Sequence, residues 1–210
     1  MYHKGLTKGI ILQNAIKIIE DTGIKGFTMK LLADTLGVKT ASLYKHYDNL
    51  DALITEVGLY ALNTQHTKMM QAIGRKERDE AVIALAQAYR KFAKKHHALY
   101  ALIMEIPTSE NEILQTAVSM VTEPVVKVLK TFSLEENRMK HLQRVFRAIL
   151  HGFINQERAG YFTYFTVDIE ESYNLAILVF LEGVHSAEKE HLTITGENTL
   201  PNADIDEDDE

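Results

Sequence analysis

The sequence of 210 residues contains no cysteine and only three prolines. The absence of cysteine excludes disulfide bonds and metal sites with thiolate ligands. Proline interrupts helices, so its scarcity permits long regular segments, and the strict alternation of apolar and polar residues that is typical of half-buried strands is hard to find. We therefore predict an all-α protein.

Long apolar runs are also missing. No segment approaches the roughly 18 consecutive apolar residues that a membrane span requires. Residues 1–8 carry basic side chains, but no apolar core of signal-peptide length follows them. Hydrophobic residues make up 46 % of the chain and charged residues 25 %, as in an ordinary soluble globular protein. We expect a soluble cytoplasmic protein that has no membrane partner.

The net charge of −6 is unevenly distributed along the chain. Residues 1–55 contain seven lysines and five acidic residues, whereas residues 197–210 contain seven acidic residues and no basic one. The remainder is close to neutral, so the first part of the protein is mildly basic and permits binding to nucleic acid. From residue 193 onward the polar, acidic composition predicts disorder.

Apolar residues at helical spacing predict about nine helices. The first four are expected to begin at polar N-cap residues, namely Thr7, Thr28, Thr40 and the pair Asp48–Asn49. The third should end near Tyr47 and the fourth near Ala72. Further helices are predicted at residues 79–95, from 97 to just before Pro107, and at 111–132, 135–159 and 168–192, with Pro124 expected to kink or break the segment 111–132.

Residues 28–53 predict a helix-turn-helix, because two short helices flank a turn centred on Gly37. Ala33 permits the two helices to cross closely, and four larger side chains would fill the space between them: Leu36, Val38, Leu43 and Tyr47. The outward side chains of the second helix are small at its start and then cationic or hydrogen-bonding. They are Thr40, Ala41, Ser42, Tyr44, Lys45 and His46. This order suits a helix whose start enters the major groove of DNA while later residues meet phosphates.

This pattern resembles the DNA-binding domain of the TetR family of bacterial repressors, over about residues 7–58. The matching positions are Thr28, Leu32–Ala33, Leu36–Gly37–Val38, Leu43–Tyr44, His46–Tyr47 and Leu53. The resemblance implies a homodimer built from the last two helices and a ligand pocket in the C-terminal domain. It places Thr40, Ala41 and Ser42 near base edges, just after Lys39, and it places Thr28, Tyr44, Lys45 and His46 near phosphates. Leu50 departs from the family, where many members carry a DNA-contacting lysine.

We accordingly expect a DNA-binding domain in residues 1–50, an effector-binding and dimerisation domain in residues 51–192 and an acidic tail in residues 193–210. The partners would be a near-palindromic double-stranded operator and a small apolar effector. Candidate effector contacts, which could equally be plain core, are Tyr89, Phe92, Tyr100, Met104, Met120, Phe146, Leu150, His151 and Phe153. The last helix is apolar on more than one face, so the candidate dimer contacts are Tyr173, Ile177, Phe180, Leu181 and Val184.

Two other interpretations compete with a ligand-responsive repressor. The pairs Glu182–His185 and Glu188–His191 have the spacing of di-iron helix motifs. Both lie on one helix and six residues apart, so they project in different directions. Motifs of zinc proteases, serine hydrolases and phosphate-binding loops are absent, and we expect neither an enzyme nor a cofactor or metal site. The second alternative is a DNA-binding protein of the same fold without a ligand switch.

Overall fold

A computed structural model describes residues 5–106, 110–164 and 166–190 of the protein, and the predicted tail lies outside these ranges. Within them all regular structure is helical, as predicted, and no strand occurs. The helices are α1 (Lys8–Thr22), the 3₁₀ helix η1 (Ile24–Gly26), α2 (Met29–Leu36), α3 (Thr40–Leu43), α4 (Leu50–Ile73), α5 (Arg78–Lys95), α6 (His97–Glu105), α7 (Glu112–Ala117), α8 (Ser119–Leu129), α9 (Glu136–Arg158) and α10 (Ile169–Glu190).

The first helices begin where their capping residues predict. The hydroxyl of Thr7 accepts a hydrogen bond from the Ile10 N–H at 3.3 Å, and the hydroxyl of Thr28 accepts one from Leu31 at 3.1 Å. Asn49, rather than Asp48, caps α4 through the Ala52 N–H at 2.8 Å. These bonds satisfy N–H groups that lack a partner inside the helix, which fixes each helix start.

The third helix differs from the prediction at both ends. Its N-cap is Lys39, which makes no side-chain capping bond, and Thr40 is its first helical residue. The helix ends at Leu43 rather than near Tyr47. Beyond Leu43, the His46 N–H bonds back to the Leu43 carbonyl only three residues earlier, so the chain tightens into a turn before it reaches Tyr47.

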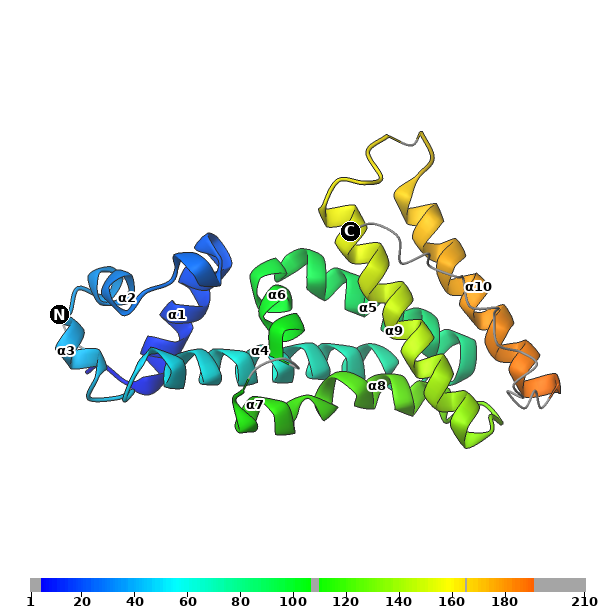
Figure 1. The fold of residues 1–210 in the computed structure, drawn as a ribbon, viewed down its shortest axis with the longest axis horizontal. Helices are drawn as coiled ribbons and strands as arrows, with labels where there is room; N and C mark the ends of the chain where they lie inside the picture. Colours follow the sequence, from blue (N-terminus) through cyan, green and yellow to red (C-terminus); the bar gives the residue numbers. More distant parts are fainter. Residues whose placement is uncertain (1–4, 107–109, 165, 191–210) are drawn as a thin grey trace, which may run out of the picture.

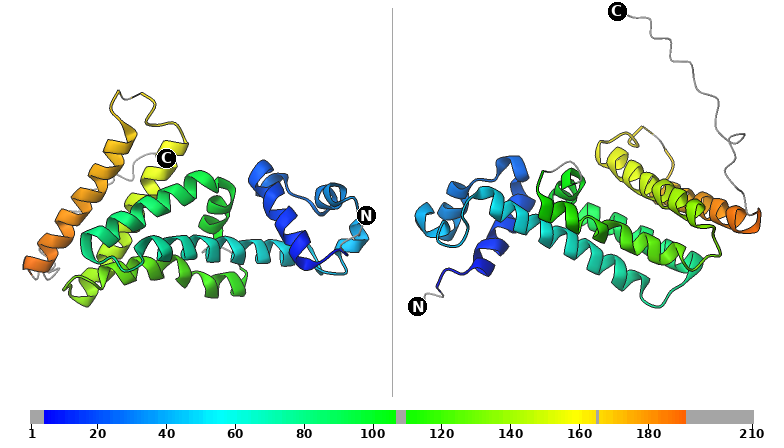
Figure 2. Two further views of the ribbon diagram at one scale, coloured as in Figure 1. Left: turned by 180° about the vertical axis from the view of Figure 1, so that it is seen from behind. Right: turned by 60° about the horizontal axis from the view of Figure 1, so that its bottom comes forward.

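Helix α4 connects the two parts of the molecule. Figure 1 shows it running from the N-terminal helices α1–α3 into the C-terminal helices, where α5 and α8 pack against it. The predicted domain boundary at residues 50 and 51 falls in its first turn. Helices α9 and α10 pack together at the end of the molecule that lies away from α1–α3 (Figure 2). No helix among the described residues is long and apolar enough to cross a membrane.

The predicted helix 111–132 is two helices, and Pro124 does not cause the interruption. The break lies at Val118, where two N–H groups bond only three residues back, from Val118 to Gln115 and from Val121 to Val118. Pro124 lies buried inside α8. There it removes a single N–H bond, and the packed helix continues across it.

Candidate nucleic-acid interface and effector region

The turn between α2 and α3 fixes how α3 is presented. Gly37 ends α2 in the left-handed conformation, with φ of 65°, which costs a residue without a side chain little. The Val38 N–H then bonds to the Ala33 carbonyl at 3.0 Å. Ala33 and Leu43 are fully buried, as predicted, so α3 packs on α2 through its inner face only. Its other face points to solvent.

The predicted DNA-contact residues all lie on the outer surface, and none of them is buried. Tyr44 is 49 % exposed although its ring is apolar. The exposed residues are Thr28, Lys39, Ala41, Tyr44 and Lys45, and the partly exposed residues are Thr40, Ser42 and His46. The structure therefore brings the eight residues onto an accessible surface at one end of the molecule. Their contacts with DNA stay a prediction.

Tyr47 belongs to the core, as predicted, and it ties the turn after α3 to the start of α1. Its ring is buried, and its hydroxyl donates a hydrogen bond to the Lys8 carbonyl at 3.5 Å. The Lys8 ammonium lies 5.3 Å from the centre of the ring. Burial, with the nearby Glu56 carboxylate, raises the pKa of the Tyr47 phenol and keeps it neutral.

Residues of the C-terminal helices contact α4 close to its DNA-binding end. The Asn111 side-chain amide donates a hydrogen bond to the Thr55 hydroxyl at 2.7 Å. One turn further along α4, Gly58 lies against Leu114 of α7, and a Cβ atom on Gly58 would stand 2.9 Å from the Leu114 side chain. Glu20 of α1 also contacts His96 at 2.8 Å. A movement of α6 or α7 would therefore act directly on the helices that position α3.

Three of the predicted effector residues form a polar chain inside the C-terminal helices. The hydroxyls of Tyr89 and Tyr100 lie 3.5 Å apart, and the Tyr100 hydroxyl lies 2.7 Å from Nδ1 of His151. The other ring nitrogen of His151 lies 2.7 Å from the Asn155 amide. Burial first, and then the positive charges of Arg147 and Arg158, lower the pKa of His151. A neutral imidazole is therefore favoured at this point in the core.

The other six predicted effector residues are not brought into one cavity. The Phe146 ring stacks on Phe180 at 4.6 Å between ring centres, and Phe92 and Leu150 are buried. Met104 and Met120 are only partly buried. Phe92 lines a pocket beside α4, whereas Phe153 lines a different one.

The pocket at Phe153 has a volume of about 240 Å³ and lies between α9, the α9–α10 connection and α10. The residues that line it with Phe153 are Phe162, Val167, Ile169 and Ser172. Phe153 packs against Phe162 at 4.9 Å and against Tyr173 at 5.0 Å between ring centres. The sequence prediction missed the residues of the connection, although the aromatic residues at 161–165 were a signal for them.

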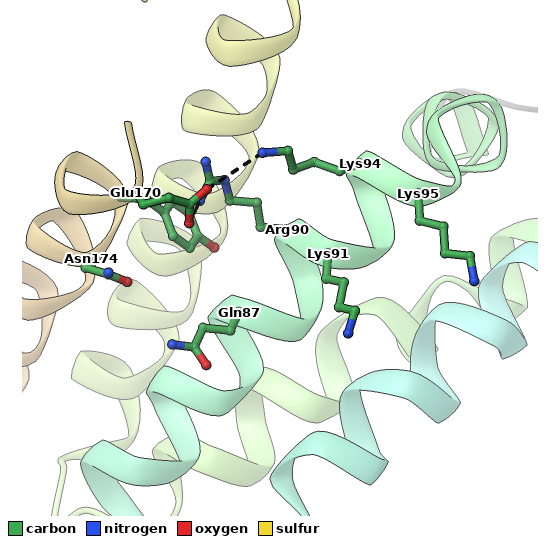
Figure 3. Close-up of a pocket in the computed structure, with 8 residues that line it drawn as sticks. Gln87, Arg90, Lys91, Lys94, Lys95, Glu170 and Asn174 are labelled. Atoms are coloured by element: carbon green, nitrogen blue, oxygen red, sulfur yellow. Dashed lines mark hydrogen bonds and ion pairs between the residues drawn. The ribbon is translucent and has the colours of Figure 1, made fainter. Parts of the chain in front are cut away.

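Sequence reasoning also missed an ion-pair cluster centred on Arg90. This side chain is almost completely buried, and its guanidinium binds both carboxylate oxygens of Glu157 at 2.8 and 2.9 Å and Glu170 at 2.7 Å. Lys94 adds a bond to Glu157 at 2.9 Å. The Arg90 hydrogen bonds lower the pKa of Glu157. Figure 3 shows Arg90 and Glu170 at one end of a pocket of about 520 Å³, with Lys91 and Lys95 directed toward the other side.

The five predicted dimer contacts lie inside a single chain, so the structure corrects this prediction. Tyr173, Ile177, Phe180, Leu181 and Val184 are all at most 4 % exposed. They are covered because α10 turns this face toward α5 and α9, as in the bond from the Tyr173 hydroxyl to the Ala86 carbonyl at 2.7 Å. The exposed apolar residues of α10 are Leu175, Leu178 and Val179.

Two of the four residues considered as metal ligands have other partners. His185 lies 3.0 Å from the Asp79 carboxylate, and Glu188 pairs with Arg78 at 2.7 Å. Glu182 is exposed, and His191 lies outside the described residues. Across the described part of the chain, no group of three or more potential ligands is placed to hold a metal ion.

Comparison with known proteins assigns both parts of the chain. Residues 11–57 match the model of bacterial regulatory proteins of the tetR family, and residues 82–180 match the model of the tetracyclin repressor-like C-terminal domain. The HTH-type transcriptional regulator YobS of Bacillus subtilis is 28 % identical over 182 residues, which are 86 % of this chain and 93 % of that protein.

Solved structures share the fold at lower identity. A protein of unknown function from Rhodococcus sp. RHA1 has a TM-score of 0.77 at 21 % identity, over 87 % of this chain and 97 % of that one. A variant of TetR from Acinetobacter baumannii AYE, solved in complex with minocycline, has a TM-score of 0.62 at 17 % identity, over 88 % and 99 %. A DNA-binding helix-turn-helix, a ligand-binding domain and a dimer are typical of this family. The chain belongs to the TetR family of transcriptional regulators.

Proposed function

We propose that this protein is a cytoplasmic transcriptional repressor that binds operator DNA as a homodimer and is released by a small-molecule effector. The observation that carries this proposal is the face of α3 and the following turn. Its inner residues Leu43 and Tyr47 are buried, while Lys39 and Lys45 stand free in solvent with no ion pair among the described residues. A pair of crossing helices with only a packing role would not need cationic and hydroxyl side chains on this outer face.

The mode of DNA binding follows from this face. Thr40 and Ser42 stand at the start of α3, where short side chains allow close approach to base edges. Lys45 and Tyr44 follow in the turn, and we propose that they contact phosphates. In a twofold dimer the two copies of α3 would enter successive major grooves, so half-site centres should lie about 34 Å apart or at a multiple of that distance.

For the dimer we now propose the outer face of α10 rather than the face predicted from the sequence. Leu175, Leu178 and Val179 follow helical spacing and are half exposed or more, and Val145 of α9 is also exposed. Apolar side chains grouped on neighbouring helices favour burial against an identical surface. The buried residues beneath them, such as Phe180, would hold α10 in place.

For the effector we propose the region between Phe153 and the polar chain of Tyr100 and His151. The pocket at Phe153 is bordered mainly by apolar side chains, which suits a small apolar ligand, and Ser172 adds one polar side chain to its lining. The neutral His151 belongs to the same helix as Phe153. A ligand here would act on α9 and α10, and through them on α5 and α8, which pack against α4. DNA and effector would then favour different separations of the two α3 helices, with a reciprocal coupling of about 1–3 kcal/mol.

The decisive experiment measures DNA binding and effector binding in one thermodynamic cycle. Fluorescence anisotropy with DNA from upstream of the gene should give a salt-dependent affinity that Lys39→Ala plus Lys45→Ala weakens strongly. Once a ligand is identified by mass spectrometry of the purified protein, calorimetry with and without operator should give effector affinities that differ by the same factor as the DNA affinities. Equal effector affinities would exclude release by this ligand.

The alternative is a DNA-binding protein of the same fold without a ligand switch. It is favoured by the burial of Tyr89, Phe146 and Leu150 in the core, because these residues were predicted to line the effector pocket. The two candidates differ in one result. A protein without the switch would bind its operator with the same affinity in the presence and absence of cell extract. In a protein with the switch, cell extract that contains the effector would weaken operator binding, and Phe162→Trp, which fills the pocket at Phe153, would remove this effect.

A further inference from the structure

Three pockets adjoin one another along the outer face of α5, and together they are called here the α5 groove. A first pocket of about 190 Å³ lies between α5 and α10. It shares Gln87 and Asn174 with the pocket of about 520 Å³ in Figure 3. That pocket in turn shares Lys91 and Lys95 with a third, of about 330 Å³, beside α4. The shared residues make the groove run from the middle of α10 to α4.

The two ends of the α5 groove differ in chemistry. The end between α5 and α10 is lined by Ile83, Ile177 and Leu178 and is apolar. The other end carries four ammonium groups, from Lys68, Lys91, Lys94 and Lys95. Glu157 and Glu170 hold Lys94 and the neighbouring Arg90, whereas neither Lys91 nor Lys95 forms an ion pair with any described residue. Cations spread over two open pockets fit an extended acidic chain better than a compact ligand.

The helices place the end of α10 beyond the apolar end of this groove, beside the start of α5. Arg78 pairs with Glu188 at 2.7 Å, and Arg90 pairs with Glu170 at 2.7 Å, so α5 and α10 are antiparallel. The chain that continues after Glu190 therefore starts beside the beginning of α5. From Arg78 to Lys91 the helix rises about 20 Å. Residues 191–204 span at most about 45 Å when extended, so the acidic residues that follow reach Lys91 and Lys95 with length to spare.

The order of residues in this segment matches the order of the groove. Leu192, Ile194 and Leu200 come first, and six acidic residues follow between 204 and 210. We propose that residues 191–210 bind in the α5 groove of their own chain, with the apolar residues toward Ile83 and the acidic residues at Lys91 and Lys95. The segment then covers the lysines of α5 against other polyanions, so α3 and its turn keep the accessible cationic surface for DNA.

Zero-length cross-linking of the full chain tests this arrangement. A carbodiimide joins a carboxylate to an ammonium group only when the two are in contact, and mass spectrometry identifies the joined peptides. We expect residues 204–210 to be linked to Lys68, Lys91 and Lys95, with a yield that falls severalfold at high salt. Lys127 and Lys130 of α8 are exposed and serve as matched controls. Links spread evenly over these two lysines and the groove lysines would overturn the proposal.

Charge exchange separates this arrangement from a general attraction. Lys91→Glu plus Lys95→Glu should abolish the links to the groove, whereas Lys127→Glu plus Lys130→Glu should leave them unchanged, with circular dichroism confirming the fold of both. Reversing Asp208, Asp209 and Glu210 to lysine in the first variant should restore the links. An equal mixture of isotope-labelled and unlabelled protein should give links within one chain only. Links between labelled and unlabelled peptides would instead assign the groove to the segment of a second copy and overturn the proposal.

Discussion

The DNA-binding helices and the C-terminal helices are fixed by polar contacts of very different range. In the first part, the capping bonds of Thr7 and Thr28 close three residues away. In the second part, Arg90 meets Glu157 across 67 positions of the sequence, and Arg78 meets Glu188 across 110. The first part is therefore organised by short stretches of sequence, whereas the second depends on α5, α9 and α10 assembling together.

This difference separates the consequences of substitution. In the first part the outer residues of α3 touch little else in the chain, so changing them should affect DNA binding and leave stability nearly unchanged. In the second part the polar and aromatic residues hold helices together, so changing them should first affect stability or assembly. Four predictions test this division, beginning with the largest effect.

Neighbouring residues of α10 should separate folding from dimer formation. Phe180→Asp places an unpaired charge against Phe146 in the core, so we expect a loss of about 4 kcal/mol or more and an unfolded chain. Val179→Asp, at a position that is 56 % exposed, should leave the thermal transition of the monomer intact but abolish the dimer. Circular dichroism and light scattering measure the two effects. A folded Phe180→Asp protein, or a dimeric Val179→Asp protein, would contradict this assignment of the two faces.

Arg90 should contribute more to the free energy of unfolding than any surface charge of α5. Arg90→Leu leaves the carboxylate of Glu157 poorly exposed and without its bidentate partner, so we expect a loss of about 3 kcal/mol in urea unfolding. The neighbouring Lys94→Leu removes an ion pair whose ammonium is half exposed, and its cost should stay below about 1 kcal/mol. Equal costs for the two variants would mean that the buried cluster contributes no more than a surface pair.

The same difference in range explains what could be predicted from the sequence. The N-caps at Thr7, Thr28 and Asn49 and the turn at Gly37 depend on neighbours within a few residues, and all were predicted. The burial of Tyr47 was also predicted, from its place in the helix-turn-helix pattern, although its partner Lys8 is 39 positions away. The predicted end of α3 was wrong by about one turn, because helix ends depend on tightening that leaves no clear pattern.

The C-terminal site could not be predicted in the same way. Periodicity identified an apolar stripe on α10 but not which neighbour covers it, so residues such as Ile177 were assigned to a second copy instead of to α5 and α9. Arg90 was not predicted as a functional or structural residue, because its partners Glu157 and Glu170 are distant in sequence. Pairing between distant helices requires the packed structure.

The surface of α3 should respond with altered DNA affinity at constant stability. Lys45→Ala removes a phosphate contact, so binding should weaken by about tenfold for every DNA sequence and the slope of affinity against salt should fall by about one. Ser42→Ala or Thr40→Ala should instead change base preference. Gel shifts on a set of operator variants, with melting temperatures as the control, measure both. Unchanged affinity and preference for all three would mean that another surface reads the DNA.

The smallest effect concerns the pH dependence of the ion pair that joins the ends of α5 and α10. Hydrogen bonds from Arg78 and from the Ser133 N–H lower the pKa of Glu188 from its usual 4.5 to about 2. Because the folded protein holds this carboxylate in its charged form, the pair stabilises the fold fully above about pH 4.5, and this contribution is lost as the pH falls toward 2.

Glu188→Gln removes this contribution of the ion pair. The melting temperatures of the two proteins should therefore differ most near neutral pH and converge below pH 4.5. The contribution is small because the Arg78 side chain is 44 % exposed and solvent screens the pair. A constant difference between the two proteins from pH 6 to pH 2 would mean that the glutamine disturbs packing rather than charge.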